Sequence, residues 1–97
     1  MMELSLPKKG EETIMEISVP TYDKWFHFEW EDGYSLRCTV QNSEVVLEGN
    51  KEGLISLARH LLELAQDHVP EYTHFHLDEF NSLEDGSAEL IIVRRNF

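Results

Sequence analysis

The stretch Asn50 to Ala65, with the sequence NKEGLISLARHLLELA, decides the fold because it carries the long helical pattern of this chain. Asn50 is a good N-cap residue, and Glu52 lies in the first turn, where a carboxylate favours the helix dipole. Apolar residues then recur at the spacing of one helix face: Leu54, Leu57, Ala58, Leu61, Leu62 and Ala65. The pattern predicts one amphipathic helix that ends near His68, before Pro70, and covers a small sheet with its apolar stripe.

Four runs before the helix alternate between apolar and polar residues, as half-buried strands do. They are residues 13–19, 24–30, 34–41 and 44–48. The turn-forming residues Glu31, Asp32 and Gly33 separate the second run from the third, which favours a β-hairpin of 24–30 with 34–41. In the third run we expect Tyr34, Leu36, Cys38 and Val40 to face inward.

Two more strands are predicted after the helix, at residues 72–78 and 88–95, with a polar turn at 81–87 between them. The last run is apolar on both faces, which predicts a central position in the sheet. The sequence therefore predicts an α+β fold with a single antiparallel or mixed sheet of about six strands. One amphipathic helix packs on one face of it, in the order ββββαββ. We expect residues 1–12 to form a flexible arm and residues 13–97 a single domain.

The charge of the chain restricts its partners, because 19 Asp and Glu residues stand against 8 Lys and Arg residues, a net charge of −11. A field of this sign repels nucleic acid and anionic lipid, and it speeds the encounter with a basic partner. Binding to nucleic acid or to a membrane is therefore not expected. Cys38 is the single cysteine, and no signal peptide or bilayer-spanning run is visible, so we predict a cytoplasmic protein.

A metal site is one alternative that the residues leave open. His74, His76 and Asp78 would lie on one face of a strand, with Phe75 and Leu77 on the core face. Two imidazoles and a carboxylate are suitable ligands for zinc or iron. No nucleophile elbow and no glycine-rich phosphate loop is visible. We therefore predict a protein that is not an enzyme and needs no cofactor, with this metal site as the competing hypothesis.

Four segments carry a resemblance to a known family. They are Glu48 to Leu54, Leu57 to Leu62, His76 to Asp78 and the run LEDGSAELII from Leu83 to Ile92. In these segments the chain resembles the Immunity protein 32 family of bacterial polymorphic toxin systems. The resemblance implies an antitoxin that binds and blocks a cognate toxin domain, often a nuclease, without cofactor or turnover.

The residues themselves indicate where a partner would bind. Turn formers are dense from Asp78 to Ser87, which predicts a compact, ordered and acidic loop. The predicted partner-binding residues are Asp78, Glu79, Asn81, Glu84 and Asp85, with Trp25 and Tyr72 as aromatic anchors. The expected partner is a basic protein toxin. A homo-oligomeric structural domain, in which the sheet face with Trp25 and His27 meets a second copy, is the other alternative.

Overall fold

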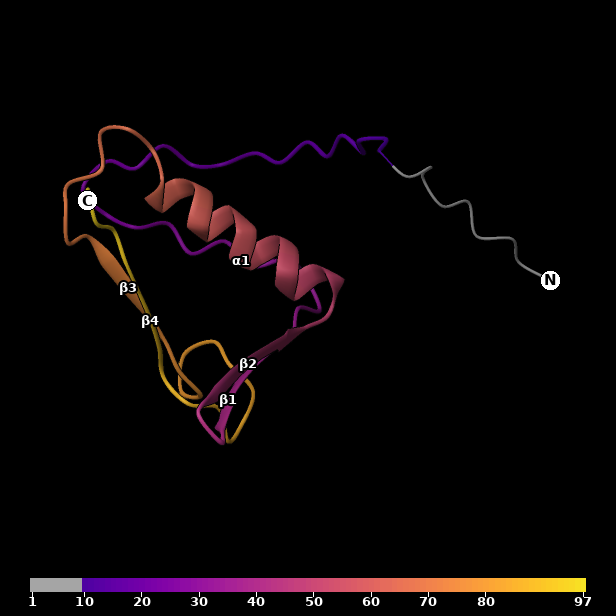
Figure 1. Cartoon of the computed structure of the whole chain (residues 1–97). Coiled ribbons are helices and arrows are strands. Elements are labelled where there is room, and N and C mark those ends of the chain that lie inside the picture. Colours follow the sequence, from indigo (N-terminus) through magenta and orange to yellow (C-terminus); the bar gives the residue numbers. More distant parts are fainter. Residues whose placement is uncertain (1–9) are drawn as a thin grey trace.

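The computed structural model describes residues 10–97, in which the chain forms one helix and four strands (Figure 1). In chain order they are β1 (Leu36–Gln41), β2 (Glu44–Gly49), α1 (Lys51–Leu64), β3 (His74–Leu77) and β4 (Leu90–Val93). β1 pairs antiparallel with β2, and β3 pairs antiparallel with β4. The predicted α+β class is confirmed. The predicted single sheet of six strands is wrong, because the described residues form two separate two-stranded sheets.

Helix α1 begins where the sequence predicted. The side-chain oxygen of Asn50 accepts hydrogen bonds from the backbone N–H groups of Gly53, at 2.8 Å, and Ser35, at 2.9 Å. One side chain therefore caps the helix and ties it to the residues before β1. The helix ends at Leu64, about one turn before the predicted end. There the guanidinium of Arg94, from the end of β4, donates to the Leu64 carbonyl at 2.9 Å and complements the negative end of the helix dipole.

The inward face of α1 is more polar than predicted. Ser56, His60 and Glu63 are fully buried, alongside Leu57 and Leu64. Three leucines of the predicted core-facing stripe are exposed instead: Leu54 by 50%, Leu61 by 41% and Leu62 by 46%. The prediction for this stripe is therefore only partly right, and the buried face is turned toward the polar side of the helix.

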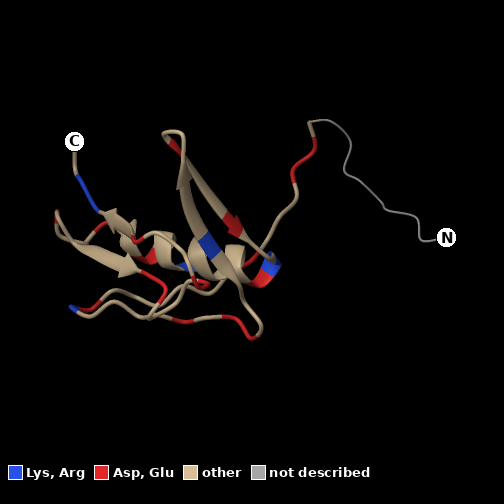
Figure 2. Cartoon of the chain, turned by 90° about the horizontal axis from the view of Figure 1, so that it is seen from below, with Lys and Arg blue, Asp and Glu red and all other residues tan. Residues whose placement is uncertain are grey.

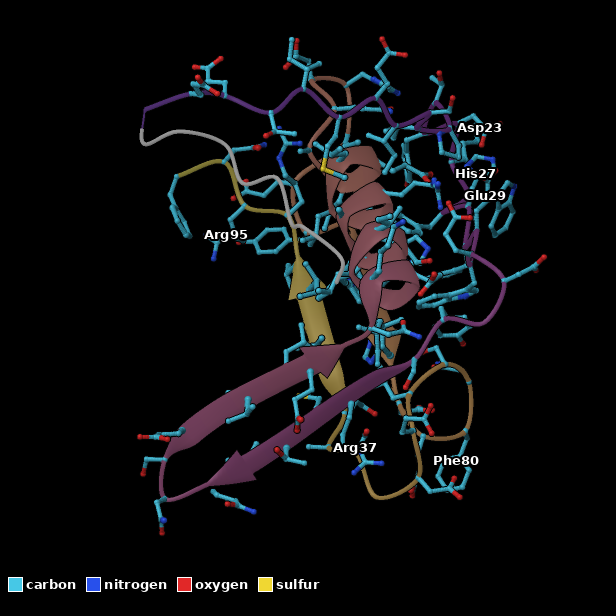
Figure 3. The ribbon with its side chains drawn as sticks, turned by 90° about the vertical axis from the view of Figure 1, so that its right-hand side faces the viewer. Asp23, His27, Glu29, Arg37, Phe80 and Arg95 are labelled. Carbon is cyan, nitrogen blue, oxygen red and sulfur yellow. The ribbon has the colours of Figure 1, made fainter. Side chains whose placement is uncertain are left out.

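This polar face binds the backbone of residues 18–31, which run beside α1 (Figures 1 and 3). Two side chains of α1 accept from backbone N–H groups of that segment: Ser56 Oγ from Glu31 (2.8 Å) and Glu63 Oε2 from His27 (3.1 Å). Just beyond the end of the helix, Gln66 Oε1 accepts from the N–H of Tyr22 (2.9 Å). Arg59 donates to the carbonyls of Ser18, at 3.1 Å, and Glu29, at 3.3 Å. The segment pairs with helix side chains and not with a strand. The predicted strands at 13–19 and 24–30, and the predicted hairpin of 24–30 with 34–41, are therefore wrong.

The hairpin of β1 and β2 turns at Asn42 and Ser43, between the predicted runs 34–41 and 44–48. Both residues have positive φ angles, +50° and +68°, which suit a two-residue hairpin turn. Leu36 and Cys38 are buried as expected, and Cys38 is a small core residue. Val40 is 58% exposed, contrary to the prediction, because the tip of the hairpin extends beyond the core (Figure 3).

The hairpin of β3 and β4 packs one face on the core. Phe75 and Leu77 are buried while His74 and His76 are exposed, which confirms the alternation predicted for this strand. Among the strands of the described residues, β4 pairs with β3 alone, so its predicted central position is wrong. Its outward face, which includes Ile91, is accordingly exposed.

The two hairpins are joined by the segment between β3 and β4. The backbone N–H of Glu84 donates to the Leu36 carbonyl at 2.8 Å, and that of Ala88 donates to the Cys38 carbonyl at 2.7 Å. These bonds satisfy the edge of β1 that faces away from β2. The buried core lies between the hairpins and α1, with the rings of Phe26 and Trp30 packed against it.

The described residues include only part of the predicted N-terminal arm. Residues 1–9 of the predicted arm lie outside the described residues. Residues 10–12 are exposed and form no helix or strand. A single domain over 13–97 stays a prediction.

Gly53→Ala tests the close approach of α1 to the residues before β1. A Cβ atom at this position would lie 2.2 Å from the Ser35 carbonyl oxygen. Helix propensity alone favours alanine by about 1 kcal/mol. The overlap is with backbone, however, so we expect the free energy of unfolding in urea to fall by about 2 kcal/mol. Lys51→Ala, exposed in the same turn, is the control. A Gly53→Ala protein as stable as this control would contradict the close approach.

His60→Leu tests the burial of an imidazole without hydrogen bonds. Neither ring nitrogen of His60 has a hydrogen-bond partner among residues 10–97, and the ring packs on aromatic neighbours such as Trp30, at 4.5 Å between centroids. Burial lowers the pKa of His60 to about 4, opposed by the nearby Glu29 carbonyl and assisted by the charge of Arg59. The unfolded chain takes up this proton near pH 6.5, so stability that is present above pH 6.5 is lost as the pH falls toward 4.

The size of this loss is about 3 kcal/mol for one imidazole, given the shift in the pKa of His60. Urea titrations at pH 7 and pH 4 measure the fall in the free energy of unfolding between these two pH values. We expect this fall to be about 3 kcal/mol smaller in His60→Leu than in the unmodified protein. His74→Leu, on an exposed face, should keep the full loss. Equal pH dependence in the two variants would show that His60 is not the group responsible.

Candidate partner-binding site

The acidic loop, residues 78–87, is held in shape by its own side chains. The Asp78 carboxylate accepts from the backbone N–H of Asn81 at 3.0 Å, and the Glu79 carboxylate accepts from that of Gly86 at 2.7 Å. Gly86 has a φ of +84°, which glycine adopts without strain. These contacts give the compact loop that its turn-forming residues predicted.

A depression of about 390 Å³ opens on this loop. Four of the predicted partner-binding residues line it: Glu79, Asn81, Glu84 and Asp85. The fifth predicted loop residue, Asp78, does not line it, because its carboxylate serves the turn. The loop and the depression therefore gather three carboxylates on one surface.

The carboxylates of the acidic loop take part in no salt bridge with a Lys or Arg of the described residues. Glu84 accepts from the hydroxyl of Ser35 at 2.8 Å, and Glu79 from one backbone N–H. Each carboxylate has further lone pairs for a partner's donors. Acidic residues also occur on most other loops and strand ends (Figure 2), so the loop is one part of a widely negative surface.

The two predicted aromatic anchors do not line this depression. Tyr72 is 61% exposed but lies before β3, at the end opposite the loop, where the Arg95 guanidinium sits 4.8 Å from its ring centroid. Its φ of +73° is unusual for a bulky residue. Trp25 is 77% exposed in the turn between Asp23 and His27. The structure thus separates both aromatic residues from the carboxylates with which they were grouped.

Phe80 is the aromatic residue that the sequence analysis missed. It is 89% exposed and lines the depression, and Figure 3 shows it on the outer side of the loop, pointing away from α1. A phenylalanine held in solvent by an ordered loop is a feature of interaction surfaces. Its position among turn formers, between Glu79 and Asn81, is the signal that could have identified it.

A second pocket, of about 210 Å³, adjoins the depression and shares Asn81 and Ser82 with it. Its other walls are Phe28 and Trp30, from the segment beside α1, and His76 and Leu77, from β3. Its lining is mostly apolar. No single stretch of sequence predicts this pocket, because its walls come from separate segments.

The three candidate metal ligands do not converge. His74 Nδ1 lies 2.8 Å from the Tyr72 carbonyl, and His76 Nδ1 lies 3.3 Å from the Glu89 carboxylate. The Asp78 carboxylate points into its own turn. No group of three or more His, Cys, Asp or Glu residues in the described part of the chain could hold a metal ion.

A different pair of groups is electrostatically coupled, on the far side of α1 from β4 (Figure 3). His27 Nδ1 lies 2.8 Å from the Glu63 carboxylate, and its Nε2 lies 3.5 Å from Asp23. The hydrogen bond to Glu63 raises the pKa of His27, against a smaller effect of desolvation. This pair anchors the segment beside α1 and takes no part in the depression.

The helix of the described residues is too short and too polar to cross a membrane. Comparison with known proteins gives one family: the sequence model of Immunity protein 32 matches residues 44–95. The match covers more than half of the chain and includes β2, α1, β3, the acidic loop and β4. No curated protein and no solved structure gives a significant match. The match confirms the resemblance seen in the sequence, and the chain belongs to the Immunity protein 32 family.

Proposed function

We propose that this protein neutralises a cognate toxin through its acidic loop; membership of an immunity protein family implies the toxin-neutralising role and the toxin partner. Such proteins are typically inhibitors without enzymatic turnover, in line with the prediction that this chain is not an enzyme. In this proposal the acidic loop lies on a basic surface of the toxin, such as the surface with which a nuclease binds nucleic acid.

The unpaired carboxylates of the depression carry this proposal. Glu79, Glu84 and Asp85 line one concave surface and form no ion pair with a Lys or Arg in the described part of the chain. A basic partner would gain charge-assisted hydrogen bonds there without breaking ion pairs within the inhibitor. Electrostatic attraction of this kind raises the association rate and disfavours acidic competitors.

Phe80 supports the same surface as an anchor. A contact of carboxylates alone would be weak in salt, since exposed charges are screened over about 8 Å at physiological ionic strength. Aromatic residues in the centre of an interface contribute most of the binding energy in many complexes. Phe80 lies among the carboxylates of the depression and would be buried when the toxin covers it. Trp25 and Tyr72 stay predicted contacts at separate positions, and a cytoplasmic location also stays a prediction.

Neutralisation of the loop tests the proposal. The triple variant Glu79→Gln, Glu84→Gln and Asp85→Asn removes three charges with little change of shape. We expect its affinity for the toxin encoded beside this protein to fall by about tenfold or more at low salt, mainly through the association rate. The salt dependence of the affinity should become weaker. Biolayer interferometry at several salt concentrations measures both quantities.

A matched control separates the loop from the overall charge. Glu16→Gln, Glu44→Gln and Asp67→Asn remove three exposed charges elsewhere on the chain. This control should bind nearly as tightly as the unmodified protein. Equal losses of affinity in the two triple variants would mean that only the net charge matters. If the loop variant binds the toxin with unchanged affinity and unchanged salt dependence, the loop is not the contact.

A further inference from the structure

The pocket beside the acidic loop has a combination of features that the proposed inhibition by charge does not use. Phe28 is 46% exposed at its wall, while Leu77 beneath it is buried. An apolar cavity of about 150 Å³ is large enough to bind benzene, so the 210 Å³ of this pocket accommodates one aromatic ring. The pocket shares Asn81 and Ser82 with the depression that carries the carboxylates.

The walls of this pocket are fixed in advance. The backbone on either side of Phe28 and Trp30 is held to α1 by the bonds of His27 to Glu63 and of Glu31 to Ser56. The Trp30 ring also stacks on Tyr34, with 4.3 Å between ring centroids. A pocket whose walls are already ordered binds without a large entropic cost.

The opposite wall is equally constrained. The hydroxyl of Tyr34 donates to the Ser82 carbonyl at 3.0 Å, so the residue that supports Trp30 also holds the acidic loop. The Asn81 side chain donates to the His76 carbonyl at 3.2 Å and accepts from the Asp78 N–H at 2.9 Å. The loop, β3 and the segment beside α1 are thus linked around the opening.

We infer that this pocket receives an aromatic side chain of the toxin, from a toxin segment that also carries a Lys or Arg next to it. Charge complementarity selects this occupant, because Glu79 and Asp85 lie across Asn81 and Ser82 from the pocket and have no cation of their own in the described residues. The aromatic ring fills the apolar opening and the neighbouring cation meets the carboxylates. This inference rests on the proposed inhibition of a toxin and adds the chemistry of the toxin segment that is recognised.

His76→Trp tests the inference, because a larger ring at the pocket wall blocks the opening. We expect its affinity for the toxin encoded beside this protein to fall by about 30-fold or more, mainly through faster dissociation. His74→Trp is the matched control, since His74 lies on the same exposed face of β3 and does not line the pocket. The control should bind as tightly as the unmodified protein.

The outcomes distinguish the pocket from the proposed function. If the unmodified protein binds the toxin and His76→Trp binds equally well, the pocket is not used, while inhibition through the loop stands. If the toxin does not bind the unmodified protein, the proposed function fails, and the inference fails with it. If His76→Trp has a much lower melting temperature than the control, Phe28→Leu is used in its place, since it removes an aromatic ring from the pocket wall. Unchanged affinity in Phe28→Leu would then overturn the inference.

Discussion

The hydrogen bonds from polar side chains of α1 to the backbone of residues 18–31 are the interaction on which the rest of this structure depends. Ser56, Arg59 and Glu63 recur at the spacing of one helix face, and Gln66, just beyond the end of α1, continues the series, so one short region binds a long stretch of irregular chain. A backbone segment without a neighbouring strand must find other partners when it is buried. These side chains supply them, which explains how a small domain stays folded with only two-stranded sheets in its described part.

The buried polar face of α1 is energetically unfavourable in part, but it also orders the wall of the apolar pocket. Burying polar side chains is unfavourable unless they are hydrogen-bonded, and within the described part of the chain the ring nitrogens of His60 and one oxygen of Glu63 have no hydrogen-bond partner. The same arrangement holds His27 and Glu31 in place, and the side chains between them form one wall of the apolar pocket. The order of the pocket is therefore a consequence of the polar face of the helix.

Local patterns in the sequence predicted the local structure well. The N-cap at Asn50, the turn at Asn42 and Ser43 and the alternation through β3 were all readable, because each depends on residues close together in the chain. The shape of the acidic loop was predictable for the same reason. Glu79, Glu84 and Asp85 line one depression, whereas the Asp78 carboxylate accepts hydrogen bonds within the turn. Their role as toxin contacts stays a prediction.

Contacts between segments that lie far apart in the chain could not be predicted from the sequence. Alternation in residues 24–30 indicated a strand, yet alternation shows only that two faces differ, and it does not show whether the backbone meets a strand or a helix. The leucines of α1 indicated its buried face, but Ser56 and Glu63 are buried because of backbone groups far away in the sequence. The apolar pocket joins β3 and the acidic loop to Phe28 and Trp30, so no single stretch of sequence contains it.

The two parts of the proposed contact surface differ in what they can discriminate. Exposed carboxylates attract many basic proteins and lose strength with salt, so they set the rate of encounter more than the choice of partner. A pocket of fixed shape rejects side chains that do not fit it, which makes it the better source of specificity. The family match at residues 44–95 includes the acidic loop but not Phe28 or Trp30. In the proposed complex, therefore, the charged part of the surface lies within the region that matches the family, and the part that selects the toxin is completed by a segment outside it.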